Sequence, residues 1–167
     1  LTRVLSAAFG EHITAAVIGL YLPFWFIEGE AVFNETKLSN TGRGRSAIFE
    51  SGTRTRLLAG MEWSYDKAYL GSYRDRVPNH YELGYLLYTF GAKHYGQSMW
   101  DSVASYIARN PWNPFAFSTG LKRHTGYNKA QFFTTAMDSL GKNWGSRDSG
   151  LVLVAEEDKT NSRDWPE

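Results

Sequence analysis

A glutamate inside an aromatic segment is the residue of this chain whose surroundings point most clearly to chemistry. The segment is Pro23-Phe-Trp-Phe-Ile-Glu-Gly-Glu-Ala-Val-Phe-Asn-Glu35, and Glu28 stands in its most apolar part. Taking an unpaired carboxylate out of water is costly, so a sequence that encloses one normally supplies a metal, a cation or several hydrogen-bond donors. We therefore take Glu28 as the leading functional candidate.

Two neighbours of Glu28 support this interpretation. Gly29 carries no side chain, so another backbone or a bound group can approach closely at that point. Glu35 follows two helical turns later, on the same predicted stripe as Trp25 and Val32. We expect Glu35 to be a supporting acceptor that orients a histidine or an arginine around the site.

The pattern Trp-x-x-Glu-Gly-x-Ala, formed by Trp25, Glu28, Gly29 and Ala31, resembles the third-ligand helix of gluzincin (peptidase MA-like) zinc metallopeptidases. The resemblance implies that Glu28 is the third zinc ligand and that two histidines of an HExxH helix complete the site. No HExxH occurs in this sequence, so we expect that helix upstream of Leu1. The intact protein would then act on a peptide or protein substrate. The fragment alone should neither bind zinc tightly nor hydrolyse peptides.

A second match is Tyr81-Glu-Leu-Gly84, which is similar to the Tyr-x-x-Gly helix of gluzincin aminopeptidases. The resemblance implies that the Tyr81 hydroxyl stabilises the oxyanion formed during peptide hydrolysis. A phenol can donate to that charge at neutral pH, because its own pKa is near 10. The family has a lysine before the glycine where this chain has Leu83, and a structural role for Tyr81 stays open. The resemblance to gluzincins covers roughly residues 23–144 of this sequence.

The segment Thr41-Gly-Arg-Gly-Arg45 is a loop by composition. Arg43 and Arg45 are candidate substrate-binding residues, because exposed amides and two guanidinium groups suit a substrate carboxylate. The alternative is a flexible, solvated loop. Arg-Gly-Arg-Ser and Gly-Ser-Tyr-Arg-Asp are also similar to segments of periplasmic proteins in which a TolB-like propeller is joined to such a domain. That similarity implies a periplasmic or secreted location and a following propeller as a partner.

The bulk composition narrows the classes of function. The chain has 167 residues, a net charge of +1 and no long basic run, which disfavours nucleic acid as a partner. No apolar stretch is as long as a membrane span requires, so none is expected. The absence of cysteine excludes disulfides and thiolate metal sites.

Hydrophobic periodicity predicts a mainly α fold, a multi-helix bundle with little or no strand. The resemblance to gluzincins implies that this bundle is similar to the C-terminal subdomain of zincin-like metallopeptidases. We expect one helical domain over 1–144 and a linker or the start of a following domain over 145–167. A single strand is expected over 151–154. The predicted helices are 1–10, 23–38, 48–58, 63–73, a central buried one from Asn79 through Phe90, 97–109, and 128–144.

A function of another class fits the same sequence. The chain would then be a non-catalytic helical interaction or scaffolding domain, in which Glu28 pairs with Arg43, Arg45 or Arg54 and the aromatic surface docks a partner. A degenerate peptidase fold without metal is a further alternative.

Overall fold

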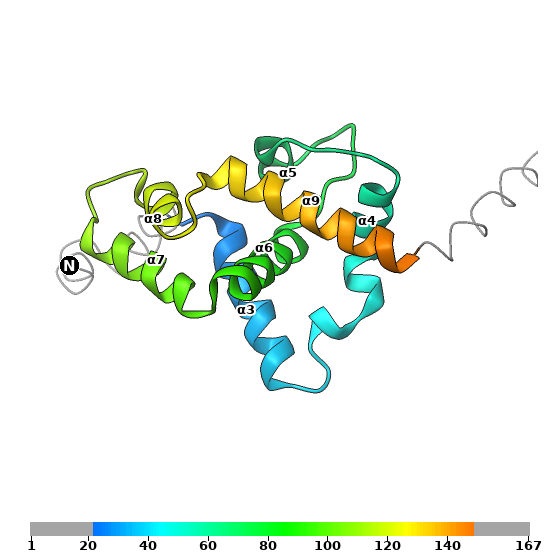
Figure 1. The fold of residues 1–167 in the computed structure, drawn as a ribbon, viewed down its shortest axis with the longest axis horizontal. Coiled ribbons are helices and arrows are strands. Elements are labelled where there is room, and N and C mark those ends of the chain that lie inside the picture. Colours follow the sequence, from blue (N-terminus) through cyan, green and yellow to red (C-terminus); the bar gives the residue numbers. More distant parts are fainter. Residues whose placement is uncertain (1–21, 149–167) are drawn as a thin grey trace, which may run out of the picture.

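Residues 22–148 are described by a computed structural model, and within that range the chain is helical without any strand (Figure 1). The predicted mainly α fold is therefore confirmed. The elements are seven α-helices and one short 3-10 turn: α3 (Phe24–Leu38), η1 (Arg43–Arg45), α4 (Ala47–Leu58), α5 (Tyr65–Leu70), α6 (His80–Tyr95), α7 (Ser98–Arg109), α8 (Ala116–Thr125) and α9 (Lys129–Asp148).

Helices α3 and α6 form the centre of the fold and touch through glycine. A Cβ placed on Gly84 of α6 would lie 2.7 Å from the backbone nitrogen of Gly29 in α3. The two backbones can meet so closely because neither residue has a side chain. This contact fixes how the helix that carries Glu28 lies on the helix that carries Tyr81.

The other helices surround this pair. Helix α9 runs across α6, α7 packs on α8 at one end of the molecule, and α4 packs on α9 at the other (Figure 1). The enclosed core is rich in aromatic rings and is the central cluster predicted around α6. Its largest fully buried side chains include Trp25, Trp100, Phe132 and Phe133.

Helices α6 and α9 begin where the sequence predicts. Asn79 caps α6, its side-chain oxygen accepting from the Glu82 backbone N–H at 2.9 Å. Asn128 and Gln131 bond reciprocally at the start of α9, each side chain accepting from the other's backbone N–H. This is a capping box, which satisfies two N–H groups that a helix start leaves without partners.

Three predicted features differ from the structure. Helix α8 was not among the predicted helices, and the predicted helix 63–73 is shortened to Tyr65–Leu70. Helix α9 continues past Trp144 to Asp148, so the linker expected after Trp144 starts as helix. The helix expected over 1–10 and the strand expected over 151–154 lie outside the described residues.

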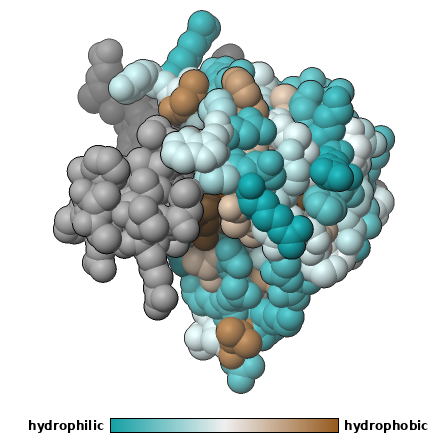
Figure 2. Space-filling model, turned by 90° about the vertical axis from the view of Figure 1, so that its left-hand side faces the viewer, coloured by the Kyte–Doolittle hydropathy of each residue, from teal (hydrophilic) through white to brown (hydrophobic). Residues whose placement is uncertain are grey.

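The face that carries α7 and α8 is mostly hydrophilic where it is visible, with scattered rather than continuous hydrophobic side chains (Figure 2). Among the described helices, none combines the length and the hydropathy that crossing a bilayer requires.

Candidate functional site

Glu28 lies on α3 at the border of the buried face, and its side chain is half-buried. The residues of α3 that reach the core are Trp25, Phe26, Gly29 and Val32. The apolar neighbours Phe24 and Ile27 are exposed. The expectation that Glu28 is enclosed was therefore wrong, because α3 packs on one face only and part of its apolar sequence points outward.

The most buried described carboxylate is instead Glu82 of α6, which is 8% exposed. One of its oxygens accepts a hydrogen bond from the Thr53 backbone N–H of α4 at 3.2 Å. Glu50, also on α4, is half-buried, and burial raises the pKa of its carboxyl despite the opposing charge of Arg54. Both glutamates lie where α4 meets the centre of the fold. Glu82 joins α4 to α6.

Glu35 holds the loop that follows α3. The guanidinium of Arg43 donates from Nε to Glu35 Oε2 at 2.9 Å, and its Nη2 lies 2.8 Å from the same oxygen. The backbone N–H of Arg43 donates to Glu35 Oε1 at 3.2 Å. The side-chain hydrogen bond from Arg43 is the main reason why the pKa of the Glu35 carboxyl is lowered. The acceptor role predicted for Glu35 is directed at an arginine here; whether it supports a metal site stays a prediction.

Arg43 also reaches α6. Its guanidinium carbon lies 4.9 Å from the centre of the Tyr81 ring, which is the distance of a cation–π contact. Glu35, Arg43 and Tyr81 are thus brought together by α3, η1 and α6. Tyr81 is 39% exposed. Glu28 precedes Glu35 by two turns on the same helix, so the Glu28 face of α3 and the Tyr81 face of α6 open toward the same side of the helix pair.

Three backbone amides of the arginine loop, those of Arg43, Gly44 and Arg45, are already used within the chain. Gly44 N–H donates to Thr36 Oγ1 at 3.0 Å, and Arg45 N–H donates to the Gly42 carbonyl at 2.9 Å. Arg45 uses its side chain as well, because Nε donates to the Ser39 carbonyl at 3.1 Å. At these three residues an anion would therefore meet guanidinium groups rather than free amides.

The arginine contacts also bear on the ion pairs considered for Glu28. Arg43 pairs with Glu35, and Arg45 bonds to the backbone of Ser39. Within residues 22–148 no hydrogen bond or ion pair to the Glu28 carboxylate is found. The half-buried carboxylate thus has no partner among the described residues, and its two oxygens are donor atoms of a kind that zinc takes.

Zinc requires more ligands than Glu28 alone provides. The described part of the chain contains no group of three or more histidine, aspartate, glutamate or cysteine side chains close enough to hold a metal ion. Zinc sites in enzymes take three protein ligands.

A second set of polar residues, not predicted from the sequence, lines a cavity of about 700 Å³ between α7 and α8. On α7 the serines at 98, 102 and 105 and the arginine at 109 recur at helical spacing. That stripe was visible in the sequence. Its facing partners, Arg123 and His124, were not recognisable because no helix was predicted over α8.

Comparisons with protein-family models, with curated proteins and with solved structures find no match to this chain. The resemblance to gluzincins therefore rests on the residues of α3 and α6 that carry it.

Proposed function

We propose that this chain is the helical, substrate-side part of a gluzincin-like zinc metallopeptidase domain, with Glu28 as its third metal ligand. The observation that carries the proposal is the Glu28 carboxylate, half-buried on α3 and without a described partner. A structural glutamate so placed would be expected to pair with a neighbouring arginine, and Arg43 and Arg45 lie in the next loop but bond elsewhere.

The remaining ligands would be two histidines of an HExxH helix upstream of Leu1. A zinc ion bound by that set would supply an activated water and a Lewis acid for peptide hydrolysis. The glutamate of HExxH would serve as the general base. Residues 22–148 would then position one ligand and line the substrate side.

Tyr81 would be the oxyanion donor in this proposal. Its side chain is partly exposed on the side of α6 toward which the Glu28 face of α3 opens, and Arg43 lies against its ring. A neutral phenol held in place can donate a hydrogen bond to a developing negative charge. The Glu35–Arg43 pair would hold that ring in position from the loop.

The two arginines would contribute to substrate binding through side chains. Arg43 uses Nε and Nη2 for Glu35, and Nη1 has no partner among the described residues. Arg45 is exposed. Both could contact a substrate carboxylate at the rim of the site. In this proposal the whole protein is periplasmic or secreted and carries a TolB-like propeller after this domain.

An interaction domain is the second candidate function. Trp112 is 80% exposed and Phe115 is 72% exposed, and both belong to the connection between α7 and α8. Exposed aromatic side chains of this size are favoured anchors in protein–protein interfaces. If this function is correct, Trp112→Ala and Phe115→Ala should abolish co-purification with a partner domain, while Glu28→Gln leaves it intact.

The metallopeptidase proposal is tested by reading the coding region for about a hundred residues upstream of Leu1, a length comparable to one small domain. The proposal expects HExxH there on a helix with an apolar face. Finding no such motif would refute the catalytic function and leave the interaction domain.

A further inference from the structure

We infer that the groove between α7 and α8 binds a small hydroxylated anion, whose phosphate or carboxylate group is held by Arg109 and Arg123. The groove is separate from the site proposed above, because α7 and α8 supply none of the residues Glu28, Glu35, Arg43 or Tyr81. The inference does not depend on the metallopeptidase proposal.

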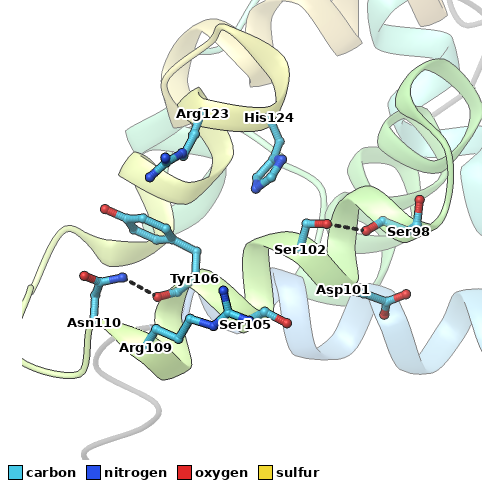
Figure 3. A pocket seen from close by; sticks show the side chains of 9 residues that line it. All are labelled: Ser98, Asp101, Ser102, Ser105, Tyr106, Arg109, Asn110, Arg123 and His124. Atoms are coloured by element: carbon cyan, nitrogen blue, oxygen red, sulfur yellow. Dashed lines mark hydrogen bonds between the residues drawn. The ribbon is translucent and has the colours of Figure 1, made fainter.

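The lining of the groove is polar on both sides. Helix α7 turns Met99, Trp100 and Val103 into the core. Its opposite stripe faces the groove with serine hydroxyls, and Arg123 and His124 come from the last turn of α8 (Figure 3). None of the described residues that line the cavity is aliphatic, and its volume of about 700 Å³ is that of a small-molecule site. The lining therefore favours a polar ligand over an apolar one.

Positive charge is concentrated at one end of this groove. Arg109 ends α7, and Arg123 lies across from it on α8 (Figure 3). Neither arginine has a carboxylate partner among the described residues. Among the described lining residues the one acidic side chain is Asp101, which stands two turns earlier on α7, about 12 Å along the helix from Arg109. The whole chain is nearly neutral at +1, so this concentration is local.

The arginine side chains are supported by their neighbours. The guanidinium carbon of Arg123 lies 5.8 Å from the centre of the Tyr106 ring, which restricts its position. Asn110 donates from Nδ2 to the Tyr106 carbonyl at 2.8 Å, which leaves its amide oxygen as an acceptor at the same end. A guanidinium matches the two oxygens of a phosphate or carboxylate, whereas an amide oxygen and serine hydroxyls match hydroxyl groups.

These features define the ligand by its chemistry. One anionic group would lie between Arg109 and Arg123, and a hydroxylated body would extend along Ser105 and Ser102 toward Asp101. An acidic group at the Asp101 end would be repelled, so the ligand should carry its charge at one end only. A sugar phosphate and a sugar carboxylate both have this form.

The test is isothermal titration of the full 167-residue chain at low salt with three probes: glucose 6-phosphate, glucuronate and glucose. We expect at least one of the two anions to bind with a Kd below about 1 mM and neutral glucose to bind at least about tenfold more weakly. The stronger anion then identifies the charged group. Absence of binding by both anions, or equal binding of glucose, would overturn the inference.

Variants locate the site. Arg109→Gln and Arg123→Gln should each weaken binding about tenfold or more, because each removes a charge-assisted contact. Lys122→Gln is the matched control, since it removes the same charge from the residue next to Arg123 without touching the groove. An equal loss in the control would show general charge attraction and contradict the inference. Circular dichroism of each variant separates loss of binding from loss of fold.

Discussion

Gly29 and Gly84 place the backbones of α3 and α6 in direct contact. A Cβ added at Gly29 would lie 2.7 Å from the Cα of Gly84, well inside the distance at which carbon atoms repel. Both glycines are buried. Because Glu28 precedes one and Tyr81 lies a turn before the other, this contact sets the relation between the two halves of the proposed site.

Replacing Gly84 with alanine should therefore destabilise the fold. The added methyl would meet backbone atoms, which cannot move aside as a side-chain end can, so we expect a loss of about 1–3 kcal/mol or more in unfolding free energy. Gly141→Ala is the control, since its Cβ would meet nothing closer than 4.0 Å. That change should stabilise α9 by about 0.5–1 kcal/mol. Urea unfolding measures both, and equal effects would contradict the described contact.

The hydrogen bond from Trp25 Nε1 to the Tyr65 hydroxyl, 3.0 Å long, ties α3 to α5. Tyr65→Phe would leave a buried indole N–H without its acceptor, at a cost of about 1–3 kcal/mol. The Tyr69 ring stacks on Tyr65, and its hydroxyl makes no hydrogen bond with a described residue. Tyr69→Phe removes only this hydroxyl. We expect it to change stability by less than half as much. A larger effect at Tyr69 than at Tyr65 in thermal unfolding would count against this bond.

The raised pKa of Tyr65 should make the unfolding free energy depend on pH in the alkaline range. Burial raises its pKa from 10 to about 12. The folded chain thus holds this proton more tightly than the unfolded chain. The resulting stability is complete below pH 10 and is lost as pH rises toward 12. Urea unfolding at about pH 9 and pH 11 should show a steeper loss for the parent chain than for Tyr65→Phe. Parallel losses would indicate that Tyr65 ionises equally in both states.

The Glu35–Arg43 pair predicts a shift at acid pH. The Glu35 carboxyl has a pKa below the ordinary 4.5 in the folded chain. The stability that this carboxylate contributes is therefore present above pH 4.5 and is lost as the pH falls through the pKa of the folded chain. Arg43→Gln should raise the pKa of Glu35 toward 4.5, as measured by carboxyl NMR titration, while Arg45→Gln leaves it unchanged. The pair is partly exposed, so water screens the attraction and the unfolding free energy should change only slightly. An unchanged Glu35 titration in Arg43→Gln would refute the pairing.

Strong local signals allowed much of this fold to be predicted from the sequence. Helix α6 is apolar on nearly every side and has an Asn79 cap, and α9 begins with a reciprocal cap at Asn128. Helix α8 lacked such signals, because its sequence Ala-Phe-Ser-Thr-Gly-Leu-Lys-Arg-His-Thr contains residues that favour turns. Packing of its buried Phe117 and Leu121 against the rest of the fold outweighs that preference.

The site was predictable only in part, for a similar reason. Glu28 was chosen because apolar residues surround it in the sequence. When most residues of a helix are apolar, the sequence does not determine which of them will face the core. The Glu35–Arg43 bond depends on a loop that returns over eight residues, which no periodicity encodes. The groove between α7 and α8 depends on how the two helices pack against each other, which the sequence pattern does not give.

The proposal that Glu28 binds zinc is tested by the zinc content of the full-length protein, measured by mass spectrometry. The parent protein should carry one zinc per chain, Glu28→Gln should lose most of it, and Glu30→Gln should keep it, because Glu30 is an exposed glutamate two positions away on α3. Mutation of a residue that only hydrogen-bonds to a metal ligand typically reduces the affinity for the metal by about 10–100-fold, and loss of a ligand should reduce it at least as much. Undiminished zinc in Glu28→Gln, or no zinc in the parent protein, would contradict the account.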